Sequence, residues 1–170
     1  MTGVRRLQGG ETALLRELRL AALREAPDAF ARTLVDALTQ PETYWTDTER
    51  SVTDPARHVM FVAEDGPRPV GLVFGIRKSR TDADLGGMWV DPRARGRGVG
   101  RALGQAVVDW ARSEQFSRVL LWVTDGNLPA QTVYERLGFV ATGRRDTLPS
   151  NPALATMEMR LHLGNGSSAP

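Results

Sequence analysis

Apolar residues recur three and four positions apart over much of the first 50 residues, which is the spacing of an amphipathic helix. The residues that carry this spacing are Leu14, Leu15, Leu18, Ala21, Ala22 and Phe30. The pair Pro27-Asp28 is typical of a break between two helices. The region is therefore predicted to be mostly helical, after a short strand at residues 4–7.

The middle of the chain changes to runs that are typical of β-strands. Residues 58–64 and 70–76 are rich in strand-forming residues, and the turn residues 65–67 separate them, which predicts an antiparallel hairpin. Residues 85–90 form a third predicted strand. The pair Gly86-Gly87 inside this strand indicates a bulge or a close approach of another backbone.

The second half mixes helices and strands without strict alternation. Helices are expected over residues 99–114 and 128–137, and a short buried strand over 119–123. A further strand begins within 139–143, and residues 155–163 alternate apolar and polar side chains, as in a half-buried strand. The predicted fold class is α+β, that is, mixed α/β.

Composition narrows the class of protein. The 170 residues suit one domain, predicted over 1–163, and the Gly- and Ser-rich residues 164–170 are predicted to be a disordered tail. No run approaches the ~20 apolar residues of a membrane helix, and the N-terminus lacks a signal-peptide pattern, so a soluble, cytoplasmic protein is expected. Lys78 is the only lysine, an arginine bias that points to GC-rich coding and a bacterial source.

The absence of cysteine excludes disulfides and thiol nucleophiles, and the count of two histidines argues against a metal site. A net charge of +2 gives no evidence for a nucleic-acid partner. The tryptophans Trp89, Trp110 and Trp122 are expected to fill the core.

The loop that leads from the third strand into the helix at 99 carries the strongest functional signal. Its glycines at 96, 98 and 100 allow close approach of a ligand, and arginines stand at 93, 95, 97 and 101. A helix start presents free N–H groups to an anion, so a diphosphate is the expected ligand. The spacing fits neither a Walker loop nor a Rossmann fingerprint. A solvated turn before a helix is the alternative interpretation.

A second segment follows at residues 127–139, with the pattern Asn-x-x-Ala-x-x-x-Tyr-x-x-x-Gly-Phe. Together with Arg95-x-x-Gly98-x-Gly100, it resembles the GNAT superfamily of acyl-CoA-dependent N-acyltransferases over roughly residues 58–146. The resemblance implies a central, mostly antiparallel sheet of six or seven strands with one splayed parallel pair. About four helices would flank this sheet.

The resemblance also implies that the chain binds acetyl-CoA. The pantetheine arm would enter between the splayed strands, the loop amides would hold the diphosphate, and Tyr134 would be the general acid for the leaving thiolate. The residues implied to contact acetyl-CoA are Met88, Trp89, Val90, Arg95, Gly96, Arg97, Gly98, Val99, Gly100, Arg101, Asn127 and Tyr134.

The implied reaction is direct attack of a primary amine on acetyl-CoA in a ternary complex. The glutamate that many relatives carry has no counterpart in residues 120–124, so Glu64 is taken as the base, with Asp84 and His58 as alternatives. Each of the three also fits an ordinary solvated side chain. A small-molecule acceptor is favoured over a protein N-terminus or lysine, and a homodimer is left open. The alternative function is a noncatalytic acyl-CoA-binding module, because the base is missing.

Overall fold

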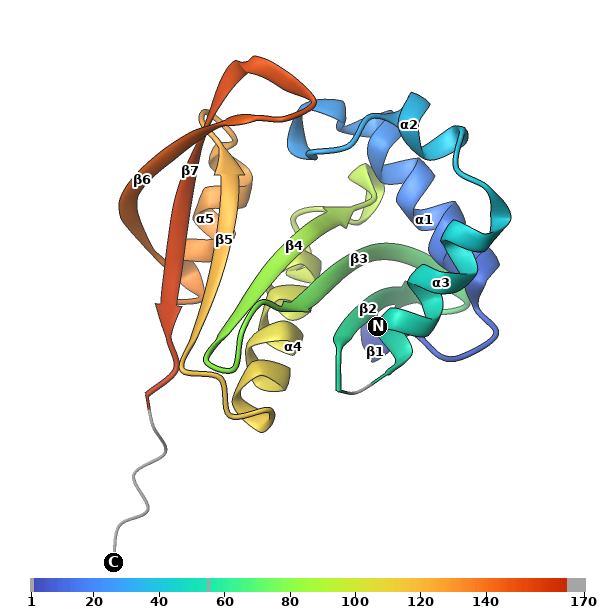
Figure 1. The fold of residues 1–170 in the computed structure, drawn as a ribbon, viewed down its shortest axis with the longest axis horizontal. Coiled ribbons are helices and arrows are strands. Elements are labelled where there is room, and N and C mark those ends of the chain that lie inside the picture. The colour runs from blue at the N-terminus through green and yellow to red at the C-terminus, as the bar shows by residue number, and fades with distance from the viewer. Residues whose placement is uncertain (1, 55, 165–170) are drawn as a thin grey trace, which may run out of the picture.

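The computed structural model describes residues 2–54 and 56–164, and a seven-stranded sheet runs through this part of the chain (Figure 1). The strand order is β1-β2-β3-β4-β5-β7-β6, and every neighbouring pair is antiparallel except β4 and β5. The strands are β1 Thr2–Arg6, β2 His58–Asp65, β3 Arg68–Arg77, β4 Asp82–Val90, β5 Arg118–Thr124, β6 Val140–Leu148 and β7 Asn151–His162. The predicted mixed fold with one parallel pair is confirmed.

Five α-helices occur among the described residues, where about four were expected. They are α1 Thr12–Glu25, α2 Leu34–Leu38, α3 Glu42–Thr53, α4 Val99–Ser113 and α5 Leu128–Arg136. The short α2 is started by a capping box, in which the Thr33 hydroxyl accepts from the Asp36 N–H at 3.0 Å and the Asp36 carboxylate accepts from the Thr33 N–H. None of the described helices is long and apolar enough to cross a membrane.

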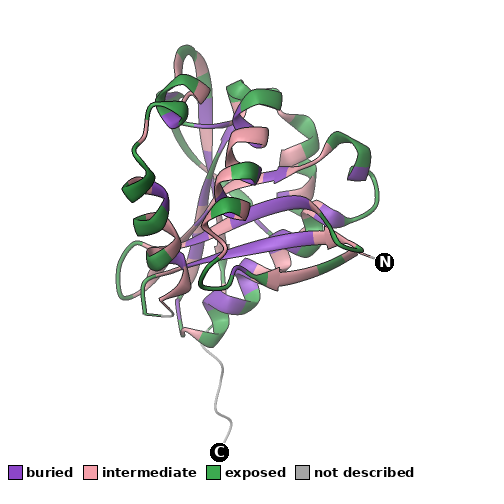
Figure 2. Cartoon of the chain, turned by 90° about the vertical axis from the view of Figure 1, so that its right-hand side faces the viewer, coloured by how far each residue is buried: buried purple, intermediate pink, exposed green. Residues whose placement is uncertain are grey.

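Both faces of the sheet are covered, which explains the nearly continuous apolar run of β2. Val59 and Phe61 belong to the core beneath α4, whereas Met60 and Val62 belong to the core beneath α1 and α3. Successive side chains of a strand point to opposite faces, so a strand between two helical layers must be apolar at every position. Figure 2 shows buried residues along the central strands and exposed ones on the outer surfaces of the helices.

A bulge interrupts β4 at the predicted glycine pair. Leu72 of β3 is paired with Trp89 and Phe74 with Gly86, so two residues of β4 oppose the single residue between them on β3. Gly87 adopts a φ of +61°, a left-handed conformation that favours glycine. The bulge changes the direction of the second half of β4.

The parallel pair β4–β5 is short. It covers only Asp82 to Asp84 against Arg118 to Leu120, and beyond it the two strands diverge (Figure 1). The edge of β4 from Leu85 to Val90 that faces β5 therefore has no strand partner among the described residues. The predicted splay is confirmed.

The predicted disordered tail lies outside the described residues except for Gly164. The extent of the domain, residues 1–163, stays a prediction.

Candidate functional site

The loop between β4 and α4 is shaped by capping and by two left-handed glycines. The Asp91 carboxylate accepts from the Arg93 N–H at 2.9 Å and starts a single 3₁₀ turn at Pro92–Ala94. Gly96 and Gly98 then adopt φ values of +73° and +81°. These conformations carry the chain directly into α4 at Val99.

The backbone amides of residues 96–101 donate to no acceptor among the described residues. Six consecutive free N–H groups at the positive end of a helix dipole form an anion site. The guanidinium of Arg101 lies beside them without an ion pair to any described carboxylate. The other loop arginines are already engaged, since Arg95 contacts Glu25 and Arg97 contacts Asp65.

A cavity of about 540 Å³ opens in front of these amides, beside the second half of β4. All of the predicted acetyl-CoA contacts line it except Arg97 and Tyr134; its lining includes Met88, Trp89, Val90, Arg95, Gly96, Gly98, Val99, Gly100, Arg101 and Asn127. The structure thus brings the loop, the second half of β4 and the start of α5 together around one space. The assignment of these residues to acetyl-CoA stays a prediction.

Asn127 has a structural role at this cavity. Its side-chain oxygen accepts from the Ala130 N–H at 3.4 Å and caps the N-terminus of α5. The capping bond fixes where α5 begins and therefore which of its residues reach the cavity.

The cavity has two walls that sequence reasoning missed. One wall is the end of α1 and the turn after it, with Glu25 and Phe30. The other is one face of α5, where Pro129, Val133 and Arg136 follow the i, i+4, i+7 spacing of a helix. That spacing is visible in the sequence, whereas the contribution of α1 has no local signal.

Glu25 holds the first wall against the loop. Its carboxylate accepts from Arg95 Nη2 at 2.6 Å and from Trp89 Nε1 at 2.9 Å. Burial opposes ionisation of Glu25, but these two hydrogen bonds outweigh it and keep its pKa below the ordinary value.

Tyr134, the predicted general acid, lies in the core, next in sequence to Val133 of the cavity wall, and is 7% exposed. Its ring packs edge-on against Phe139, with ring centroids 6.0 Å apart. The hydroxyl has no hydrogen-bond partner among the described residues, and burial raises the pKa of the phenol. The group is therefore protonated at neutral pH and free to donate.

A second cavity of about 390 Å³ adjoins the first and shares Ala29 and Phe30 with it. It is lined by the first half of β4, from Asp84 to Gly87, whereas the first cavity is lined by Met88 to Val90. The two cavities therefore meet at the β4 bulge.

The prediction that all three tryptophans fill the core is wrong for Trp122. Its side chain is 40% exposed and lines the second cavity, because Leu121 and Val123 on either side of it point into the core.

The three candidate bases lie in three different environments. Glu64 lines neither cavity, and its carboxylate is held by Arg5 at 2.8 Å, so its position gives the predicted base role no support. Asp84 lines the second cavity, with Lys78 Nζ 3.5 Å away. Burial raises the pKa of Asp84 more than the lysine lowers it, so this carboxylate is a stronger base than an ordinary aspartate.

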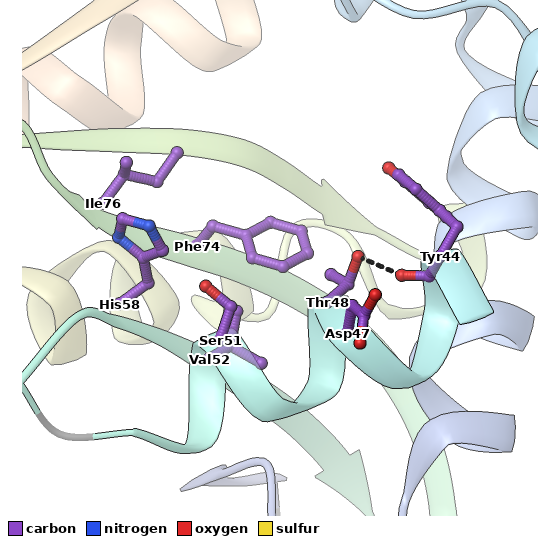
Figure 3. Close-up of a pocket in the computed structure, with 8 residues that line it drawn as sticks. All are labelled: Tyr44, Asp47, Thr48, Ser51, Val52, His58, Phe74 and Ile76. Carbon is purple, nitrogen blue, oxygen red and sulfur yellow. Dashed lines mark hydrogen bonds between the residues drawn. The ribbon is translucent and has the colours of Figure 1, made fainter.

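His58 lines a third hollow of about 390 Å³, between α3 and β3 (Figure 3). Its Nδ1 accepts from the Arg77 N–H at 3.1 Å, and burial lowers its pKa, so the ring is neutral at pH 7. Ile76 separates this hollow from the second cavity and lines both. Tyr44 lines the third hollow, while its neighbour Trp45 is buried in the core.

Comparisons with known proteins agree with this geometry. N-acetylaspartate synthetase of Danio rerio is 33% identical over 61% of this chain and 38% of its own length. Mycothiol acetyltransferase of Thermobispora bispora is 31% identical over 72% of this chain and 40% of its own length. The chain thus spans about two fifths of the length of these curated relatives.

The solved structure of spermidine N-acetyltransferase from Vibrio cholerae, in complex with CoA and spermine, superposes with a TM-score of 0.76. The match covers 95% of both chains at 18% identity and supports the fold. The model of the acetyltransferase (GNAT) family matches residues 19–139, from α1 to the end of the α5 segment. This match covers more than half of the chain, which therefore belongs to the GNAT family of acetyltransferases.

Proposed function

We propose that this chain is an N-acetyltransferase that moves the acetyl group of acetyl-CoA to a primary amine by direct attack in a ternary complex. The observation that carries the proposal is the run of free amides at 96–101, which opens on a cavity beside the unpaired edge of β4.

The residues of the first cavity fit acetyl-CoA. Free amides and the side chains of Arg101 and Arg136 supply donors and positive charge for a diphosphate. The unpaired edge of β4 at Met88 to Val90 supplies backbone groups for an amide-containing arm. Acetyl-CoA supplies an activated thioester, so the chain needs no nucleophile of its own.

We assign the steps of the reaction to residues of β4 and α5. The amine nitrogen forms a bond to the acetyl carbon, the Val90 N–H stabilises the negative charge that develops on the oxygen, and the carbon–sulfur bond breaks. Asp84, in place of Glu64, accepts the proton of the amine. The proton passes to this carboxylate directly or through a water, because Asp84 and the bulge line the same cavity. Tyr134 protonates the departing thiolate.

A small-molecule amine is the acceptor favoured by the second cavity. Its volume of about 390 Å³ suits a small ligand, and the segment from Asp146 to Pro149 lines it opposite β4. Two relatives are named for small-molecule products or acceptors, N-acetylaspartate and mycothiol. We further propose that the protein has a bacterial source and a cytoplasmic location, that it forms a homodimer, and that it has no nucleic-acid partner.

The experiment is thiol release from acetyl-CoA with a panel of small amines, amino acids and peptides, with the acetylated product identified by mass spectrometry. Turnover with a small amine supports the proposal. Binding of acetyl-CoA without turnover on any acceptor would contradict it and favour a noncatalytic acyl-CoA-binding module.

A further inference from the structure

Arg19 of α1 points its guanidinium at the second cavity without a partner. Its Nη1 is fully buried, and no described residue forms a hydrogen bond or ion pair with this side chain. The guanidinium carbon lies 4.8 Å from the centre of the Phe30 ring, a cation–π contact that holds the group in place. Burial lowers the pKa of Arg19, and Arg32, another cation, adds to this effect, whereas the Tyr44 hydroxyl opposes it.

A buried cation without a counter-ion is costly. Arg16, one turn earlier on α1, lies over Trp45 in the same manner but is paired with Glu42 at 3.1 Å. Since Arg19 has no such partner within the described chain, a ligand is the natural source of the missing negative charge. The planar edge of a guanidinium matches a carboxylate with two parallel hydrogen bonds.

The position of Arg19 connects this charge to the reaction centre. Its Nη1 lies 3.5 Å from where a Cβ of Gly87 would stand, at the bulge where the two cavities meet. Asp84 and Gly86 share the face of β4 opposite Leu85, whose side chain is in the core beneath α4. The second cavity therefore presents a cation and a proton acceptor close to the same bulge.

We propose that the second cavity binds an acceptor with a carboxylate close to its amine, such as an amino acid, and that Arg19 receives this carboxylate. The inference deepens the proposed function and rests on it for the identity of the reaction. The amine then lies toward Asp84, and an apolar side chain of the acceptor contacts Trp122, Ile76 and Leu148, which line the rest of the cavity.

The test compares amino acids with their carboxamides, which keep the amine and lose the negative charge. Both series are titrated calorimetrically into the CoA-saturated protein and assayed for acetylation at a pH at which each amine is equally deprotonated. The wild type is expected to prefer the acids about 10- to 100-fold in Kd and in kcat/KM. Arg19→Gln removes the preference, Arg19→Lys restores part of it, and Arg16→Gln, the matched control, retains it.

Equal use of acids and amides by the wild type overturns the inference, and so does a preference that survives Arg19→Gln. The comparison within the wild type needs no variant, so a folding defect in Arg19→Gln cannot mask the result. Arg19-dependent binding of acids without any turnover upholds the inference while contradicting the proposed function. Turnover of amines without any preference for a carboxylate supports the proposed function and overturns the inference.

Discussion

Glu25 at the end of α1 and Arg95 in the loop before α4 are joined by a hydrogen bond of 2.6 Å, across 70 residues of sequence. The same carboxylate oxygen accepts from the Trp89 indole. This ion pair connects the helical N-terminal region to the end of β4, so it positions one wall of the first cavity against the other.

We expect Glu25→Gln to lower the melting temperature at pH 7 by roughly 2–4 °C, which corresponds to about 1 kcal/mol after allowance for solvent screening. The folded-state pKa of Glu25 is lowered, so its stabilising effect is present above the ordinary glutamate pKa of about 4.3 and is lost as the pH falls below it. The melting temperatures of the wild type and the variant should therefore become equal at acid pH. Thermal melts from pH 3 to 8 measure this, with Glu17→Gln, an exposed position of α1, as control. A constant difference at every pH would contradict the prediction.

Arg101 is expected to contribute to CoA binding through the diphosphate. Arg101→Gln should weaken CoA by about 1 kcal/mol, roughly fivefold in Kd, and the difference should shrink at high salt. Pantetheine, which lacks the diphosphate, should bind both proteins equally. Arg112→Gln at the other end of α4 is the matched control, and an equal loss there would show that the effect is one of general charge.

Tyr134→Phe should reduce kcat by roughly 100-fold while leaving the KM for acetyl-CoA unchanged. Little stability should be lost, because the hydroxyl has no partner among the described residues to lose. Burial raises the pKa of the phenol, so kcat of the wild type should not fall through loss of this proton below about pH 10. Steady-state kinetics from pH 6 to 10 measure both effects. An unchanged kcat would remove Tyr134 from the mechanism.

Asp84→Asn should reduce kcat about 10²- to 10⁴-fold and abolish the acid limb of the kcat/KM profile. The folded-state pKa of Asp84 is raised, so the protonated form stabilises the fold and ionisation costs stability as the pH rises through that pKa. The variant should therefore melt no lower than the wild type at pH 7. Glu64→Gln, which loses the contact with Arg5, should instead be less stable and fully active. Full activity in Asp84→Asn together with a loss of activity in Glu64→Gln would instead identify Glu64 as the base.

The spacing of hydrophobic residues predicted the long helices and strands, because each face of such an element lies in a single environment along its whole length. The helices at 99–114 and 128–137 and the hairpin at 58–76 agree with α4, α5 and β2–β3. The five residues of α2 are too few to show a helical period, and its capping box is the better signal. Trp122 was misplaced because β5 is a short interior strand whose apolar run does not say which face is open.

The residues of the candidate site also differ in whether the sequence alone could indicate them. The residues that line the first cavity from β4, the loop and α5 lie within two motifs, and their local spacing indicates them. Glu25 and Arg19 could not be found in this manner, since they reach the site from α1 across more than 60 residues of sequence. The pairing of Glu64 with Arg5 is equally remote, at a sequence separation of 59.

The amino-acid sequence by itself determined the loop that is predicted to bind an anion, because left-handed glycines and the free N–H groups of a helix start are properties of neighbouring residues. Only the tertiary structure decided which side chains face the cavities, which of the candidate carboxylates lines the second cavity, and that the buried Arg19 has no carboxylate partner among the described residues. These outcomes depend on where β4 and β5 part and on how α1 packs across them, and no local pattern encodes contacts made over such a separation in the chain.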